Sequence, residues 1–238
     1  MFGTFAAARR SNVSYGLDFE GNNYVHRSLV HLAGTLAAAW LALVPLSPSA
    51  AFAAPPQRPA TQQVVLAGGC FWGMEAVFER LKGVSNVVSG FAGGNKVTAH
   101  YEIVSTGTTG HAESVQITYD PSKISFNQLL AVYFTVAHDP TELDYQGPDH
   151  GSQYRSEIFY TTDQQRALAE KFIKHLTDTH AFSSPIVTKV EVLRGFYPAE
   201  AYHQHFYDNN PDNPYIVEND KPKVDRLREK FPELLKAT

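Results

Sequence analysis

The single cysteine, Cys70, is the residue of this 238-residue chain whose type and setting most directly suggest covalent chemistry. One thiol cannot form an internal disulfide, and it cannot supply the paired ligands of a cysteine-rich zinc site. Gly68 and Gly69 precede it, and Phe71 and Trp72 follow it. A thiol ionises more readily at a helix N-terminus, and two aromatic rings beside it suit an apolar group such as a methyl on sulfur. The pattern indicates a nucleophile, with an inert buried cysteine as the alternative.

The elements that position Cys70 are predicted from the spacing of apolar residues. Residues 63–67 predict a buried strand, which the glycine pair ends. From residue 71 to residue 81, apolar side chains recur at helical spacing, and Gly83 is a suitable stop. Cys70 is therefore expected at a strand-to-helix turn, beside the first turn of the helix.

The rest of the chain mixes strands and helices without strict alternation. We expect further strands at residues 84–91, 114–119, 154–160 and 186–193. Ser125 with Gln128 predicts a capping box for a helix that runs to about residue 137, and Thr162 with Gln165 begins another. A charged amphipathic helix is expected from about Lys223. These elements predict one α+β domain over residues 61–238, with helices packed on a mixed sheet.

Residues 1–60 differ in composition from the rest and are expected to be a signal segment followed by a linker. His26 and Arg27 precede an apolar run that ends in small residues, and residues 51–53 have the small-x-small pattern of a cleavage site. Two prolines within the run disfavour a lasting membrane span. We therefore expect export to the periplasm or another extracytoplasmic location, with an uncleaved N-terminal anchor as the alternative.

Composition limits the class of partner. The chain has 24 acidic and 20 basic side chains and no dense run of Lys or Arg, which argues against nucleic acid. Aromatic residues make up 12% of the chain, enough for a packed core and an aromatic-lined pocket. No internal repeat is evident, and we expect a monomer.

Several multi-residue blocks, in a fixed order along the chain, point to one family. The segment GGCFWGMEAVFERLKGV around Cys70 resembles the active-site segment of class A peptide methionine sulfoxide reductases, whose hallmark is Gly-Cys-Phe-Trp-Gly. The later blocks of that family are similar to residues 106–113, 119–121, 138–140, 149–156 and 199–204. The resemblance runs from about residue 64 to residue 222. It implies a two-layer α/β sandwich around a mixed sheet, with a ferredoxin-like core.

The resemblance also implies roles for nine residues. Cys70 would be the nucleophile, and Glu113 would be the acid that protonates the sulfoxide oxygen. The phenols of Tyr101 and Tyr154 would hold that oxygen by hydrogen bonds. The remaining residues would receive the methyl group or line and support the site: Phe71, Trp72, Asp149, His150 and His203.

The implied chemistry explains these residue types. The sulfur of a sulfoxide is weakly electrophilic, and its oxygen leaves badly unless it is protonated. A carboxylic acid that is kept neutral near pH 7 by an apolar pocket can supply that proton. The thiolate then attacks, methionine departs, and the cysteine is left as a sulfenic acid. Each epimer of methionine sulfoxide has its own reductase, and the class A resemblance implies the S epimer.

The chain departs from many relatives in how its cysteine can be regenerated. Ile216 and Ser105 stand at positions where relatives often carry a resolving cysteine, and Cys70 has no second thiol to pair with. We therefore expect a one-cysteine cycle in which an external thiol reduces the sulfenic acid. The reductant would be a thioredoxin-like protein, a glutaredoxin or glutathione, and we expect no metal or prosthetic group.

Three other functions are compatible with a reactive cysteine. A thiol peroxidase also forms a sulfenic acid, but it usually needs a cationic partner at the thiol, and no Arg or Lys flanks Cys70. A secreted module could bind oxidised methionine without turning it over. A cysteine hydrolase would need a histidine base placed against Cys70, which the sequence does not reveal.

Overall fold

The sheet at the centre of the computed structural model is built around β1 (Gln62–Ala67), whose last four residues are fully buried. Val64 and Leu66 belong to the main hydrophobic core, while Val65 and Ala67 belong to a second, smaller core cluster. Side chains of a strand alternate between faces, so both faces of β1 are covered. This burial explains why the strand reads in the sequence as a continuous apolar run.

The structure describes residues 61–237. The predicted signal segment and linker, residues 1–60, lie outside the described residues. Within the described range, no helix combines the length and the apolar character that crossing a bilayer requires.

The six strands of the main sheet lie in the order β7-β6-β1-β3-β2-β8. Besides β1, the sheet contains β2 (Val84–Ala92), β3 (Ala112–Tyr119), β6 (Glu157–Tyr160), β7 (Lys189–Val192) and β8 (Phe196–Pro198). All neighbouring pairs are antiparallel except β6 and β7, which are parallel, so the sheet is mixed. The inner order β6-β1-β3-β2, with helices after β1 and after β3, is that of a ferredoxin-like core, as expected.

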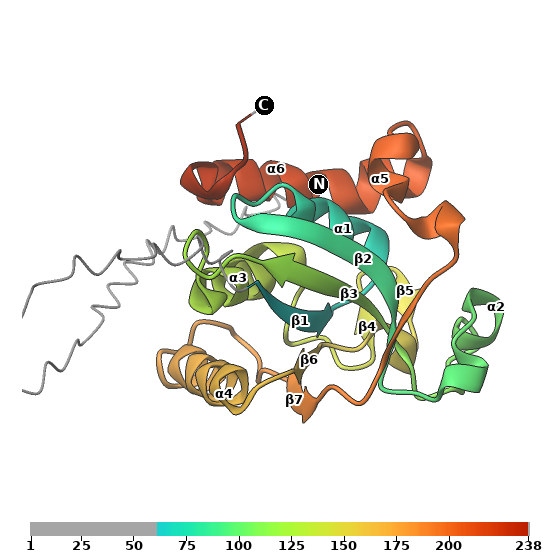
Figure 1. Cartoon of the computed structure of the whole chain (residues 1–238), viewed down its shortest axis with the longest axis horizontal. Coiled ribbons are helices and arrows are strands. Elements are labelled where there is room, and N and C mark those ends of the chain that lie inside the picture. The colour runs from blue at the N-terminus through green and yellow to red at the C-terminus, as the bar shows by residue number, and fades with distance from the viewer. Residues whose placement is uncertain (1–60, 238) are drawn as a thin grey trace, which may run out of the picture. The chain divides into compact units, whose positions relative to one another are not determined.

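The long helices pack on the Val64 and Leu66 face of the sheet, because their buried side chains join the same core cluster. They are α1 (Phe71–Glu79), α3 (Phe126–Val132), α4 (Asp163–Asp178) and α6 (Lys221–Lys230). Figure 1 shows α6 running alongside α1, and α4 lying beside β6 and β7. The predicted two-layer α+β architecture is therefore confirmed.

Short elements at one end of the sheet connect these layers and carry several of the predicted site residues. They are α2 (Tyr101–Val104), the two-stranded sheet of β4 (Tyr145–Gln146) and β5 (Asp149–His150), the 3-10 turns η3 (Ser152–Tyr154) and η4 (Ala201–His203), and α5 (Phe206–Asn209). Just before α6, residues 216–220 form a π-helical turn.

Predicted boundaries differ from the observed ones where local hydrogen bonds end an element. The strand expected over residues 154–160 begins only at Glu157, because Ser152–Tyr154 form a 3-10 turn. The helix expected to reach residue 137 is α3 followed by one π-helical turn, Tyr133–Ala137. The capping box is confirmed: the Ser125 hydroxyl accepts from the Gln128 N–H at 3.2 Å, and the Gln128 side chain accepts from the Ser125 N–H at 2.9 Å.

Replacing Ser125 with alanine tests the contribution of this cap. We expect the free energy of unfolding to fall by about 1 kcal/mol, because the Gln128 N–H loses its partner. Urea unfolding of the wild type and of Ser125→Ala measures the difference. Ser183→Ala, which changes an exposed serine in a loop, is the control and should leave the midpoint unchanged. Equal losses in both variants would contradict a capping role.

Candidate active site

The turn between β1 and α1 places Cys70 at the N-cap of the helix. Gly69 has a φ of +86°, in the left-handed region that favours glycine, and its N–H donates to the Tyr154 carbonyl at 3.2 Å. A Cβ on Gly68 would lie 2.8 Å from the ring of His138. Backbone conformation therefore requires glycine at one position, and close packing requires it at the other. The predicted strand-to-helix turn is confirmed.

The sulfur of Cys70 lies in a buried and electrostatically negative setting. The residue is 7% exposed. Burial raises the pKa of the Cys70 thiol well above its usual value, and the nearby carboxyls of Glu113 and Asp220 raise it further. The Trp72 N–H and the Lys223 ammonium lower that pKa, but they do not outweigh burial. The helix N-terminus thus favours the thiolate, as the sequence predicts, but burial is the larger effect and raises the pKa of the thiol overall.

Glu113 is brought to Cys70 by the pairing of two central strands. β1 pairs with β3 so that Ala67 lies opposite Ser114, and Glu113 therefore lies where β1 ends and the chain turns toward Cys70. Its Oε2 accepts from the Phe71 N–H at 3.1 Å, and the side chain is 2% exposed. Burial raises the pKa of Glu113 to about 8, and Asp149 and Asp220 add to the shift. The carboxyl is therefore mostly neutral at pH 7, as a proton donor must be.

The phenols of Tyr101 and Tyr154 lie near the same two groups. Burial raises the pKa of Tyr101 to about 12, with further contributions from Glu113 and Cys70. Burial also raises the pKa of Tyr154. Four nearby groups raise that pKa further: Glu113, Asp149, Tyr101 and Cys70. Both hydroxyls therefore stay protonated and can donate hydrogen bonds to an oxygen bound among them.

The aromatic residues after Cys70 occupy different positions. Phe71 is 1% exposed, and its ring lies 5.0 Å from the ring of His203. Trp72 is half-buried, stacks on Phe206 at 3.8 Å and meets the ring of Tyr215 edge-on at 5.7 Å. Trp72 therefore presents the accessible part of the apolar wall, and Phe71 supports it from the core.

A hydrogen bond from Trp72 to His203 fixes the position of the indole ring. The indole N–H donates to Nδ1 of His203 at 3.1 Å, so the neutral imidazole carries its proton on Nε2. His203 is 1% exposed, and burial lowers its pKa, which keeps the ring neutral. His203 therefore orients Trp72 and is not a charged group in the site.

Asp149 and His150 are adjacent in sequence, but the structure separates their surroundings. Asp149 is half-buried, accepts a short hydrogen bond from the Tyr215 hydroxyl, and has a pKa raised by burial. His150 is exposed and stacks on the ring of Tyr145 at 5.5 Å. A β-strand turns neighbouring side chains to opposite sides, so His150 does not share the buried position of Asp149. It nevertheless lies near enough to lower the pKa of Asp149, and its predicted role of lining or supporting the site stays a prediction.

Two charged residues of the site were missed by sequence reasoning. Asp220 is fully buried and lies 3.1 Å from the Lys223 ammonium. A Cβ on Gly73 would lie 2.1 Å from the Asp220 carboxylate, so the second glycine of the Gly-Cys-Phe-Trp-Gly segment makes room for it. A glycine inside a predicted helix is the one signal in the sequence for this close approach.

Together these groups form a site for nucleophilic attack with acid assistance. A cavity of about 200 Å³ borders it and is lined in part by Asp149, Tyr215 and Lys223. Within residues 61–237, the one group of side chains with metal-ligating geometry includes neither Cys70 nor Glu113. This arrangement can therefore support nucleophilic attack by the thiol, with a neutral carboxylic acid as proton donor and two phenols as hydrogen-bond donors.

Two solved structures are similar in fold to this chain. The reduced form of Mxr1 from Saccharomyces cerevisiae is 33% identical, with a TM-score of 0.58, and the match covers 64% of this chain and 87% of that one. Methionine sulfoxide reductase A of Corynebacterium diphtheriae is 32% identical, with a TM-score of 0.58, over 66% of this chain and 78% of that one.

Comparison of sequences extends the likeness over the described domain. The peptide methionine sulfoxide reductase MsrA 2 of Mesorhizobium japonicum is 55% identical over 176 residues, which are 74% of this chain and 90% of that protein. A protein of the same name from Synechocystis is 48% identical, over 74% of this chain and 83% of that protein. The family model for peptide methionine sulfoxide reductase matches residues 62–235. The chain therefore belongs to the peptide methionine sulfoxide reductase family.

Proposed function

We propose that this chain reduces the S epimer of methionine sulfoxide, free or in proteins, with Cys70 as the nucleophile. Membership of the family makes it a methionine sulfoxide reductase that acts in the repair of oxidised proteins. One contact carries the assignment of roles: the neutral carboxyl of Glu113, held 3.1 Å from the Phe71 N–H, stands at the N-terminus of the helix that Cys70 caps.

The first half-reaction moves one oxygen from the substrate sulfur to the Cys70 sulfur. Glu113 gives its proton to the sulfoxide oxygen, and the Cys70 sulfur attacks the sulfoxide sulfur as its own proton passes to the Glu113 carboxylate, so that a sulfur–sulfur bond forms. The protonated oxygen then moves to the Cys70 sulfur: the sulfur–oxygen bond of the substrate and the sulfur–sulfur bond break, a sulfur–oxygen bond to Cys70 forms, methionine leaves, and the cysteine is a sulfenic acid. Glu113 begins and ends this step neutral, which avoids placing a lasting charge in a buried pocket.

The binding groups follow from the polarity of the substrate. Tyr101 and Tyr154 donate to the sulfoxide oxygen without adding charge, and Trp72 covers the methyl group. Asp149, hydrogen-bonded to Tyr215, adds a carboxyl close to both the phenols and Glu113. Its negative potential favours the protonated form of Glu113, so Asp149 supports the acid.

Regeneration of Cys70 requires a thiol from outside the chain, because the chain has one cysteine. Ser105 is exposed and Ile216 is buried, and neither side chain can resolve a sulfenic acid. We infer that a first external thiol forms a mixed disulfide with Cys70 and releases water, and that a second thiol then frees Cys70. Thioredoxin-like proteins, glutaredoxins and glutathione are the candidate reductants. We further infer that the enzyme works as a monomer.

The thiol peroxidase alternative is weaker once the surroundings of the sulfur are known. Lys223 supplies a cation near Cys70, but its ammonium is paired with Asp220 at 3.1 Å. Two carboxyls near the thiol raise its pKa, which disfavours the thiolate that peroxide reduction needs. A substrate that itself takes up a proton suits this site better.

A single-turnover experiment tests the role of Cys70. After incubation with methionine S-sulfoxide and no reductant, dimedone should add once, at Cys70, as mass spectrometry of a digest will show. Cys70→Ser should lose roughly a thousandfold or more of the steady-state rate with dithiothreitol, because the nucleophile is removed. Ser105→Ala, at an exposed position, is the control and should keep the wild-type rate. Absence of a Cys70 adduct in the presence of sulfoxide would exclude this nucleophile.

The pH profile tests Glu113 as the acid. Because the acid must carry its proton, kcat/KM should fall as the pH rises through about 8, the pKa that burial gives Glu113. Glu113→Gln should lower kcat/KM by about 10²–10⁴-fold and should lack this decline. Glu102→Gln, at an exposed glutamate of α2, is the matched control and should keep both rate and profile. A Glu113→Gln enzyme with the wild-type rate and profile would refute the assignment.

Export is the remaining proposal, and it depends on residues 1–60. We expect the full chain, expressed in a bacterium with an outer membrane, to accumulate in the periplasm with its N-terminus near residue 54, as mass spectrometry would measure. A chain that starts at residue 61 should stay in the cytoplasm, which makes it the control. Full-length protein recovered only from the cytoplasm would contradict export.

A further inference from the structure

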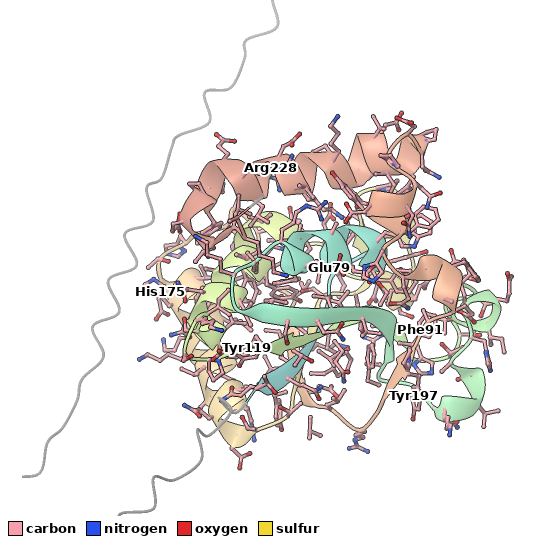
Figure 2. The ribbon with its side chains drawn as sticks, turned by 45° about the horizontal axis from the view of Figure 1, so that its top comes forward. Glu79, Phe91, Tyr119, His175, Tyr197 and Arg228 are labelled. Atoms are coloured by element: carbon pink, nitrogen blue, oxygen red, sulfur yellow. The ribbon has the colours of Figure 1, made fainter. Side chains whose placement is uncertain are left out.

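A second group of acidic and imidazole side chains lies along α1, apart from Cys70 and Glu113. Glu75 and Glu79 are one helical turn apart on α1, and His205 precedes α5. One ligating atom of each of these three residues lies within 4.8 Å of the others. Figure 2 labels Glu79 on α1, with Arg228 on the neighbouring helix α6.

One carboxylate oxygen of Glu75 is buried and accepts no hydrogen bond from any described residue. The side chain is 1% exposed, Oε2 accepts from the His205 N–H at 2.8 Å, and Oε1 has no hydrogen-bond partner among residues 61–237. The Ser89 hydroxyl lies near enough to lower the pKa of Glu75, yet it too has no partner with hydrogen-bond geometry. A buried carboxylate oxygen is costly to leave unpaired, so this arrangement calls for a cation or a proton.

Glu79 and His205 are the solvent-accessible members of the group, whereas Glu75 is buried. Nδ1 of His205 lies 2.8 Å from Oε1 of Glu79, and the two side chains are 57% and 19% exposed, respectively. His205 has a φ of +53°, a left-handed conformation that is unfavourable for a residue with a Cβ. This conformation lets one residue offer its N–H to Glu75 and its ring to Glu79.

The two carboxyls lie one helical turn apart on α1, so they repel each other when both are ionised. A divalent cation between them would remove that repulsion.

We propose that Glu75, Glu79 and His205 form a binding site for a divalent transition-metal ion of the zinc class. Two carboxylates and one imidazole are donors that Zn²⁺ accepts, whereas Mg²⁺ and Ca²⁺ prefer oxygen ligands alone. A cavity of about 500 Å³, lined in part by Glu79, His205 and Asp208, leaves room for water to complete the coordination.

An ion bound at this site would connect two segments of the chain. One is α1, which begins next to Cys70, and the other is the segment that carries His203 and Phe206. The rings of both residues contact Trp72, at 5.8 Å and 3.8 Å between centroids. A bound ion would therefore hold the wall of the methyl pocket against the helix that positions the nucleophile.

Calorimetric titration of the full chain with ZnCl₂, in the presence of a phosphine reductant, tests the proposal. We expect one ion per chain, with the same affinity in Cys70→Ser, because the thiol is not a ligand. Glu79→Gln and His205→Gln should each weaken binding by about tenfold or more. Both positions are partly exposed, which makes them safer substitutions than the buried Glu75, and circular dichroism will verify their folding.

His180→Gln is the matched control, because His180 is also an exposed histidine with a left-handed φ, of +50°. It should bind Zn²⁺ as the wild type does. ZnCl₂ should raise the unfolding temperature of the wild type and of His180→Gln, and it should not raise that of Glu79→Gln or His205→Gln. Three outcomes would overturn the proposal: no saturable binding, binding that is lost in Cys70→Ser, or wild-type affinity in both Glu79→Gln and His205→Gln.

Discussion

The hydrogen bond between the Glu113 carboxyl and the Phe71 N–H is the contact on which the rest of the site depends. It ties the second residue of β3 to the first residue of α1, and so it holds an acid beside the thiol that caps the helix. The register between β1 and β3 sets this contact, because Ala67 lies opposite Ser114. A slip of one residue would turn Glu113 to the other face of the sheet. The pairing of two central strands thus determines the chemistry.

The protonated state of the two reacting groups is a consequence of burial. Desolvation raises the pKa of the thiol and of the Glu113 carboxyl together, and the nearby carboxylates add to both shifts. Reactivity then arises when a substrate accepts the proton of Glu113. This differs from enzymes whose cysteine is ionised beforehand by a histidine or a helix dipole.

Much of the fold and part of the site follow from the sequence because they are local. The spacing of apolar residues predicts β1 and α1, and Ser125 with Gln128 predicts the start of α3. Motif blocks indicated Glu113 and Tyr154, and the family resemblance implied Tyr101. The raised pKa of Cys70, the ion pair of Asp220 and Lys223 and the exposure of His150 were not predictable, because they depend on packing between segments far apart in the chain. No local pattern encodes how deeply a helix terminus is buried.

The space left by Gly73 links the thiol to a distant part of the chain. That space is filled by Asp220, and Tyr215 and Lys223 of the same segment complete the surroundings of the thiol. Val224 and Leu227 of α6 are fully buried in the main core, which anchors this segment against the sheet and α1. A loss of packing under α6 would consequently reach the nucleophile, although none of the residues lost would touch its sulfur.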